Sequence, residues 1–197
     1  MNQDKSKKTI LLSCAKTIFM EKGYSKTKVD EICQLAGVAK GTFFYYFETK
    51  KHIILEMIHK HIQEIRSEFC HNLIYATSSL EKLDLALDII FCSKKSHVID
   101  INCDEEQSIS WMEKKLHEVK LEMLQPILYD IILEGKESGV FDVHNVDITC
   151  SVLLNGLNAF YTNKQTSFSD PKLCKVIYKG IDEIINKMLS IDVALVS

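Results

Sequence analysis

Apolar residues recur at helical spacing along most of the sequence, and few residues interrupt them. The first clear series is Ile10, Leu11, Cys14, Ala15, Ile18 and Phe19, whose members share one face of a helix. In 197 residues there are only two prolines and seven glycines, too few for the many turns of an all-β fold. The pattern predicts an all-α fold of about nine helices.

Three segments near the N-terminus are spaced as a helix-turn-helix. The first helix is expected to end before Gly23, and residues 29–36 give a second helix one apolar face. Residues 27–30 resemble a capping box for this second helix, with Thr27 as the cap. Gly37 is expected to end it, and residues 38–46 to form a third helix after a short turn. This order is typical of a DNA-binding head.

The rest of the chain predicts a larger helical body. A long helix covers Ile53 to Phe69, with no linker rich in Gly, Pro or Ser before or after it. Residues 93–106 predict a polar loop, and Pro126 is expected either to kink a helix or to begin the next one. We therefore divide the chain into a head, residues 1–48, and a body, residues 49–197.

Charge is distributed unevenly between the two ends of the chain. Residues 1–60 contain 11 Lys and 6 Asp or Glu, a net charge of +5, and the other 137 residues carry −8. A basic first third is what an anionic polymer requires of a local patch. Chance clustering of solvated lysines is the alternative, and charge alone does not exclude it.

Several protein classes are excluded or disfavoured. No stretch approaches the roughly 18 apolar residues of a membrane-spanning helix, and the N-terminal apolar run is too short for a signal peptide, so a cytoplasmic protein is expected. The seven cysteines lack CxxC spacing, which indicates reduced thiols. No nucleophile–base arrangement, phosphate-binding loop or dinucleotide fingerprint is present, and the acidic cluster of Asp100, Asp104, Glu105 and Glu106 lacks calcium-loop spacing. We expect no enzymatic activity, cofactor or metal.

One stretch of the head carries a family signature. It resembles the DNA-binding signature of the tetracycline-repressor (TetR) family of bacterial regulators, and it runs Thr27…Ile32…Leu35-Ala36-Gly37-Val38-Ala39-Lys40-Gly41-Thr42-Phe43-Phe44-Tyr45-Tyr46-Phe47…Lys50. A weaker similarity is Leu133-Glu134-Gly135…Gly139-Val140-Phe141.

The resemblance implies a one-component transcriptional regulator, a repressor that binds a pseudo-palindromic operator as a homodimer and is released by a small-molecule effector. The body would bind the effector and dimerise through the last two helices. Candidate dimer residues are Leu153, Leu157, Ile177, Ile181, Ile184 and Met188. A largely apolar effector would contact Tyr75, Phe91, Trp111, Met112, Met123, Phe160 and Tyr161, although each of these is also expected as ordinary core.

The candidate DNA contacts combine small residues with polar and basic ones. Small residues at the start of the third helix would let its backbone approach the major groove, while lysine, threonine and tyrosine side chains reach bases or phosphates. The candidates are Thr27, Lys28, Val38, Ala39, Lys40, Gly41, Thr42, Tyr45 and Lys50.

The aromatic run of the third helix divides into two groups. Phe43 and Phe47 are four residues apart, so they share a face that is expected to fill the core of the head. Phe44 stands where members of the family usually have a tyrosine whose hydroxyl meets the DNA backbone. A phenyl ring cannot donate that bond, and the role of Phe44 is left open.

Two alternatives remain at this stage. One is a redox-sensing regulator on the same scaffold, with Cys92 or Cys103 as the first thiol to test. The other is a helical ligand-binding protein that lacks specific DNA binding.

Overall fold

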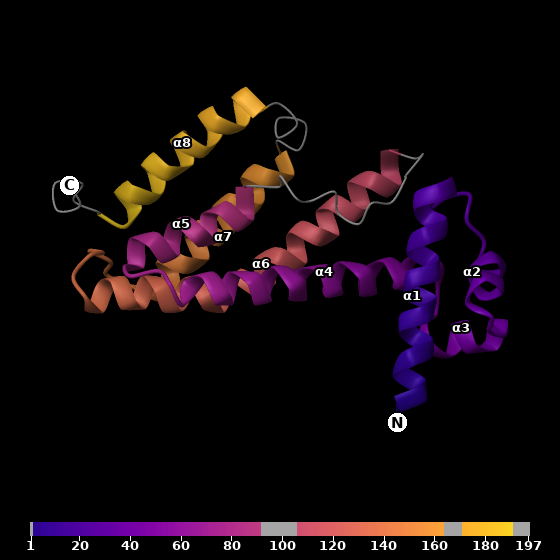
Figure 1. Ribbon diagram of the computed structural model, residues 1–197. Helices are drawn as coiled ribbons and strands as arrows, with labels where there is room; N and C mark the ends of the chain where they lie inside the picture. Colours follow the sequence, from indigo (N-terminus) through magenta and orange to yellow (C-terminus); the bar gives the residue numbers. More distant parts are fainter. Residues whose placement is uncertain (1, 92–105, 164–170, 191–197) are drawn as a thin grey trace. The chain divides into compact units, whose positions relative to one another are not determined.

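The computed structural model describes residues 2–91, 106–163 and 171–190, and side chains within 7–90, 110–159 and 179–190. The described residues form eight helices and no strand (Figure 1), so the all-α prediction is confirmed. The helices are α1 (Asn2–Lys22), α2 (Val29–Ala36), α3 (Lys40–Tyr46), α4 (Lys50–Leu73), α5 (Ser79–Phe91), α6 (Glu106–Glu137), α7 (Val146–Asn163) and α8 (Pro171–Met188). None of them has the length and apolar character needed to cross a membrane.

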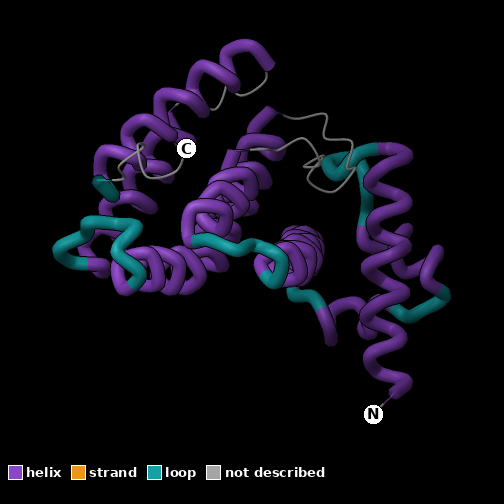
Figure 2. The backbone as a smooth tube through the Cα atoms, turned by 60° about the vertical axis from the view of Figure 1, so that its left-hand side comes forward, coloured by secondary structure: helices purple, strands orange, loops and turns teal. Residues whose placement is uncertain are grey.

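Short loops make the described connections between the helices (Figure 2). The structure also decides the position of Pro126, which the sequence left open. Pro126 lies inside α6, so it neither begins a helix nor ends one. The predicted polar loop lies outside the described residues, except that Glu106 begins α6.

The chain folds as two compact units. The first contains the described residues up to Glu64 and α6 up to Val119, and the second contains Ile65 to α5 and Lys120 to the end of α8. Both α4 and α6 therefore contribute to both units. This division lies later in the chain than the boundary after residue 48. Ile53 and Ile54, near the start of α4, are fully buried and belong to the first unit.

The core of the first unit is built mainly from the head. α1 packs against α2, and α2 packs against α3 (Figure 1). The prediction for Phe43 and Phe47 is confirmed, because both rings are fully buried with their centroids 5.5 Å apart. Other fully buried members are Leu11, Ala15, Phe19, Ile32, Ile53, Ile54 and Ile58.

The ends of α2 show one correction. Gly37 ends the helix with φ at 64°, and its amide donates to the carbonyls of Cys33 and Gln34, as the Gly37 stop predicts. The predicted capping box is wrong by one residue, because the N-cap is Lys28. The Glu31 carboxylate accepts a 2.7 Å bond from the Lys28 amide, whereas the Thr27 hydroxyl donates to the Gly23 carbonyl.

The second unit has its own apolar core. It includes Phe69, Leu83, Leu87, Ile90, Leu124, Leu128, Ile132, Phe141, Leu153, Leu157, Ile185 and Leu189. The motif around Gly135 closes this core at the end of α6. A Cβ at Gly135 would lie 2.0 Å from the ring of Phe141, and Gly139 has φ of 76°. Steric constraints therefore favour glycine at both positions.

Candidate nucleic-acid interface

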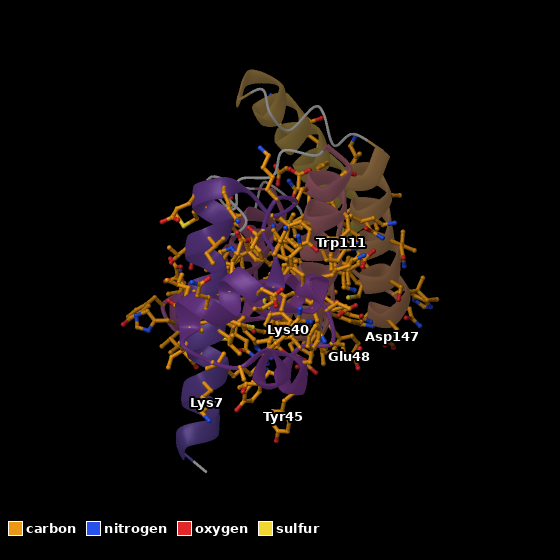
Figure 3. The ribbon with its side chains drawn as sticks, turned by 90° about the vertical axis from the view of Figure 1, so that its right-hand side faces the viewer. Lys7, Lys40, Tyr45, Glu48, Trp111 and Asp147 are labelled. Atoms are coloured by element: carbon orange, nitrogen blue, oxygen red, sulfur yellow. The ribbon has the colours of Figure 1, made fainter. Side chains whose placement is uncertain are left out.

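The outer face of α3 is set by the two phenylalanines that point inward. Because Phe43 and Phe47 are buried, helical geometry turns Lys40, Phe44 and Tyr45 outward. Tyr45 is 72% exposed and Phe44 is 47% exposed, and Figure 3 shows Tyr45 projecting away from the ribbon. Of the other sequence-predicted residues here, Ala39, Lys40 and Gly41 are exposed, while Val38 and Thr42 are half-buried. The structure therefore brings the α3 candidates together on one surface.

Gly41 has no structural need to be a glycine. A Cβ built at this position meets no atom within 4 Å, and its φ is not positive. Glycine inside a helix costs about 0.5–1 kcal/mol relative to alanine. The open space beside Gly41 leaves room for another molecule to approach the backbone closely.

Lys40 is held only by a surface ion pair. Its ammonium lies 2.7 Å from a carboxylate oxygen of Asp30, and both side chains are more than half exposed. Exposed pairs of this kind contribute about 0–1 kcal/mol. Lys40 can therefore exchange Asp30 for a phosphate or a guanine edge at little cost. Lys28 is also exposed, at the start of α2.

Lys50 has internal partners that sequence reasoning missed. Its ammonium donates to the carbonyls of Tyr24, Ser25 and Thr27 at 2.5, 3.3 and 2.9 Å, and it lies 4.2 Å from the centroid of the Tyr24 ring. An ammonium group has three N–H donors, so these carbonyls use all of them. Lys50 thus stabilises the turn between α1 and α2, a role that sequence distance hides.

Thr27 and Glu31 stabilise the same turn. Thr27 is buried, and its hydroxyl donates to the Gly23 carbonyl at 2.7 Å, so the DNA contact predicted for it has an internal competitor. The Lys22 ammonium, which pairs with Glu31, and the Lys28 amide both lower the pKa of the Glu31 carboxyl. The turn thereby presents Lys28 in a defined position.

The described effector candidates are divided between the two units. In the first, Met112 is buried, and the half-buried Trp111 has the Lys51 ammonium 4.0 Å from its ring centroid. In the second, Met123 packs partly against the core, whereas Tyr75 is 70% exposed, unlike a residue of a pocket wall. The side chains of Phe91, Phe160 and Tyr161 lie outside the described residues.

The dimer candidates lie in different environments. Leu153 and Leu157 are buried in the core of their own unit, so their side chains are not available to a partner. Ile181 and Met188 pack partly against that core, Ile184 is exposed, and the side chain of Ile177 lies outside the described residues. The exposed apolar residues of α7 are instead Ile148 and Val152. Their four-residue spacing is the signal that could have identified them.

The described residues offer little for metal or thiol chemistry. Among them, no group of three His, Cys, Asp or Glu side chains is placed to hold a metal ion. Burial raises the pKa of the Cys14, Cys33 and Cys150 thiols, which disfavours the reactive thiolate. Cys92 and Cys103 lie outside the described residues. The Cys14, Cys33 and Cys150 thiols thus give the redox alternative no support.

Comparison with known proteins matches this geometry. Residues 11–57, from α1 into α4, match the family model described as bacterial regulatory proteins, tetR family. The HTH-type transcriptional regulator QacR of Staphylococcus aureus is 24% identical over 158 residues, which cover 77% of this chain and 82% of that protein. Over residues 11–57 the chain carries the DNA-binding head of the TetR family. It is a transcriptional regulator, and the family prediction is confirmed.

Other relatives and solved structures resemble most of the chain. The fatty acid metabolism regulator protein of Bacillus subtilis is 26% identical over 142 residues, covering 71% of this chain and 73% of that protein. The structure of RolR with its ligand resorcinol has a TM-score of 0.66 and 17% identity. The match covers 98% of this chain and 92% of the RolR chain. FadR from Bacillus subtilis in complex with stearoyl-CoA has a TM-score of 0.58 and 20% identity. The match covers 91% of this chain and 98% of the FadR chain.

Proposed function

We propose that this TetR-family regulator is a one-component repressor that binds a pseudo-palindromic operator as a homodimer and leaves it when a small molecule binds the body. The observation that carries the proposal is the outer face of α3, where Lys40, Gly41 and Tyr45 are exposed on a helix anchored by two buried phenylalanines. Such a helix has the length and small N-terminal residues that fit a major groove.

The small-molecule part of the proposal is supported by the relatives. RolR was solved with resorcinol and FadR of Bacillus subtilis with stearoyl-CoA, each within a fold that this chain shares. α4 contributes residues to both units. A shift of α4 caused by a ligand in the body would therefore move Ile53 and Ile54, which are part of the core of the head.

The dimer is proposed to form through the exposed apolar residues of α7 and α8. Ile148 and Val152 lie one turn apart on α7, and Ile184 is exposed on α8. Solvent-exposed side chains of this kind on neighbouring helices are typical of a surface that a second copy covers. A two-fold dimer presents two α3 helices, and this symmetry requires a pseudo-palindromic operator.

Operator binding is tested by fluorescence anisotropy with labelled duplexes. The wild type should bind DNA from upstream of its own gene at least about tenfold more tightly than a scrambled duplex at physiological salt. Lys40→Ala combined with Tyr45→Phe should weaken that binding, and Lys40→Ala alone should lower the log–log salt slope by about 0.9 if Lys40 contacts a phosphate. Gly41→Ala should weaken operator binding while leaving the fold intact.

The matched control changes the same residue types away from α3. Lys179→Ala combined with Tyr75→Phe alters two exposed side chains of the second unit and should leave affinity unchanged. Circular dichroism shows whether each variant folds. Equal affinity of the wild type for all duplexes, or unchanged affinity in the Lys40 and Tyr45 variant, would refute the proposed interface.

A further inference from the structure

One lysine of the second unit is buried without an anionic partner. Lys120 of α6 is only 5% exposed, and no hydrogen bond or ion pair joins its ammonium to another residue in the described part of the chain. Lys50 provides the contrast, since its ammonium is satisfied by three carbonyls. Lys120 is thus a buried cation that the described fold does not neutralise.

The surroundings of Lys120 make the charge costly. One and two turns further along α6, Leu124 and Leu128 are fully buried in the apolar core of the unit, and Met123 packs against it. Removing a charged group from water costs several kcal/mol unless an opposite charge or hydrogen bonds compensate it. Burial accordingly lowers the pKa of Lys120 to about 8, and the amine still carries a proton in most molecules at neutral pH.

Packing alone does not explain a lysine here. A methionine has nearly the same length and would fill the same space without the desolvation cost. Buried ionisable groups with strongly perturbed pKa values are concentrated at functional sites. The missing partner of Lys120 is therefore expected to be a bound anion.

We propose that Lys120 recognises the effector, and that the effector is an apolar molecule bearing one carboxylate. The inference rests on the proposed function, because it names the chemical class of the effector. A single ammonium balances a single negative charge, and a dianionic phosphate would leave excess charge in apolar surroundings. The carboxylate accepts a charge-assisted bond from Lys120, and the apolar part of the ligand packs beside Met123, which is only partly buried.

The proposal is tested by calorimetry on the full chain without DNA. The probes are two pairs that differ in charge, decanoate with 1-decanol and 2-naphthoate with 2-naphthol, together with decyltrimethylammonium as a cation. At least one carboxylate should bind about tenfold more tightly than its uncharged partner, as expected for one charge-assisted bond. The cation should bind more weakly than the alcohol.

Variants assign the preference to one residue. Lys120→Met should abolish the preference for carboxylate, Lys120→Arg should retain part of it, and Lys114→Met, at an exposed position of the same helix, should change nothing. Thermal melting shows that each variant is folded. Equal binding of every charged and uncharged pair, absence of carboxylate binding, or a preference that survives Lys120→Met would each overturn the proposal.

Operator release is measured separately. If the carboxylate binds through Lys120 but does not reduce operator affinity, or if no operator is bound at all, the repressor mechanism fails while the ligand assignment stands. If operator binding is specific but no carboxylate binds, the ligand assignment fails and the regulator remains.

Discussion

At the scale of single residues, two lysines of this chain are used in opposite ways. The Lys50 ammonium gives its three N–H groups to the turn between α1 and α2, so its charge is balanced by carbonyl dipoles. Lys120 is more deeply buried and has no partner within the described residues. The first contributes stability to the head, and the second costs stability in the body.

Replacing Lys120 with methionine should stabilise the protein in the absence of ligand. The folded pKa of about 8 lies below the 10.5 of a free lysine, so the folded state binds fewer protons between these values and wild-type stability rises with pH across that range. At pH 7 the cost is fully present, and Lys120→Met should raise the free energy of unfolding by up to about 3 kcal/mol. The gain should be smaller at pH 9.5. Urea unfolding at both pH values checks this, and an equal gain at both would contradict it.

Phe44 is expected to contact a thymine methyl group. Its ring is 47% exposed beside Lys40 on the outer face of α3, and it has no hydroxyl for a phosphate. Apolar side chains in a major groove recognise the C5-methyl of thymine. Replacing single thymines by uracil in the operator should weaken wild-type binding at one position at least, and Phe44→Ala should remove that sensitivity. If both proteins lose the same affinity at every position, the contact does not exist.

At the scale of elements, the junction of α6 and α7 depends on a close contact. The amides of Val140 and Phe141 donate to the Gly135 carbonyl at 2.9 and 3.0 Å, which folds the chain back so that the Phe141 ring covers Gly135. Phe141 is buried in the core of the unit. Gly135 and Phe141 therefore pack directly against each other.

Substitution of Gly135 should strongly disturb this contact with Phe141. A Cβ would lie 2.0 Å from the Phe141 ring, so Gly135→Ala should destabilise the protein by about 1–3 kcal/mol through overpacking. Phe141→Leu in the same chain should recover part of the loss, because the smaller side chain leaves room. Denaturant unfolding of the two single variants and the double variant measures the coupling. Simple additivity would show that the two side chains do not interact.

At the scale of the whole molecule, the exposed apolar residues of α7 are expected to hold two subunits together. Ile148 and Val152 are 62% and 54% exposed, so polar substitutions there should leave each subunit folded. Ile148→Asp combined with Val152→Asp should convert the dimer to a monomer and weaken operator binding at least about tenfold, since each subunit reads one half-site. Sedimentation equilibrium measures the mass.

The control for the dimer uses another exposed isoleucine. Ile74 is 76% exposed near the end of α4, so Ile74→Asp adds the same charge outside the proposed face and should remain dimeric. A Val152 and Ile148 variant that stays dimeric would show that the contact lies elsewhere.

The sequence by itself determined the features that depend on neighbours along the chain. The period of apolar residues predicts the all-α fold, and the four-residue spacing of Phe43 and Phe47 predicts which face of α3 points inward. Gly37 predicts the end of α2, because only a residue without a Cβ adopts its φ of 64° easily. The signature around these residues identified the family.

Only the tertiary structure decided contacts between distant residues. Lys50 is 23 to 26 residues from the carbonyls that it binds, and no local pattern predicts such partners. In α7 the apolar residues occupy two faces, so Leu153 and Leu157 could be assigned to the core only when the packing of the unit was known. The burial of Lys120 also could not be predicted from the sequence. Burial depends on which side chains cover a helix face, and those side chains come from elsewhere in the chain.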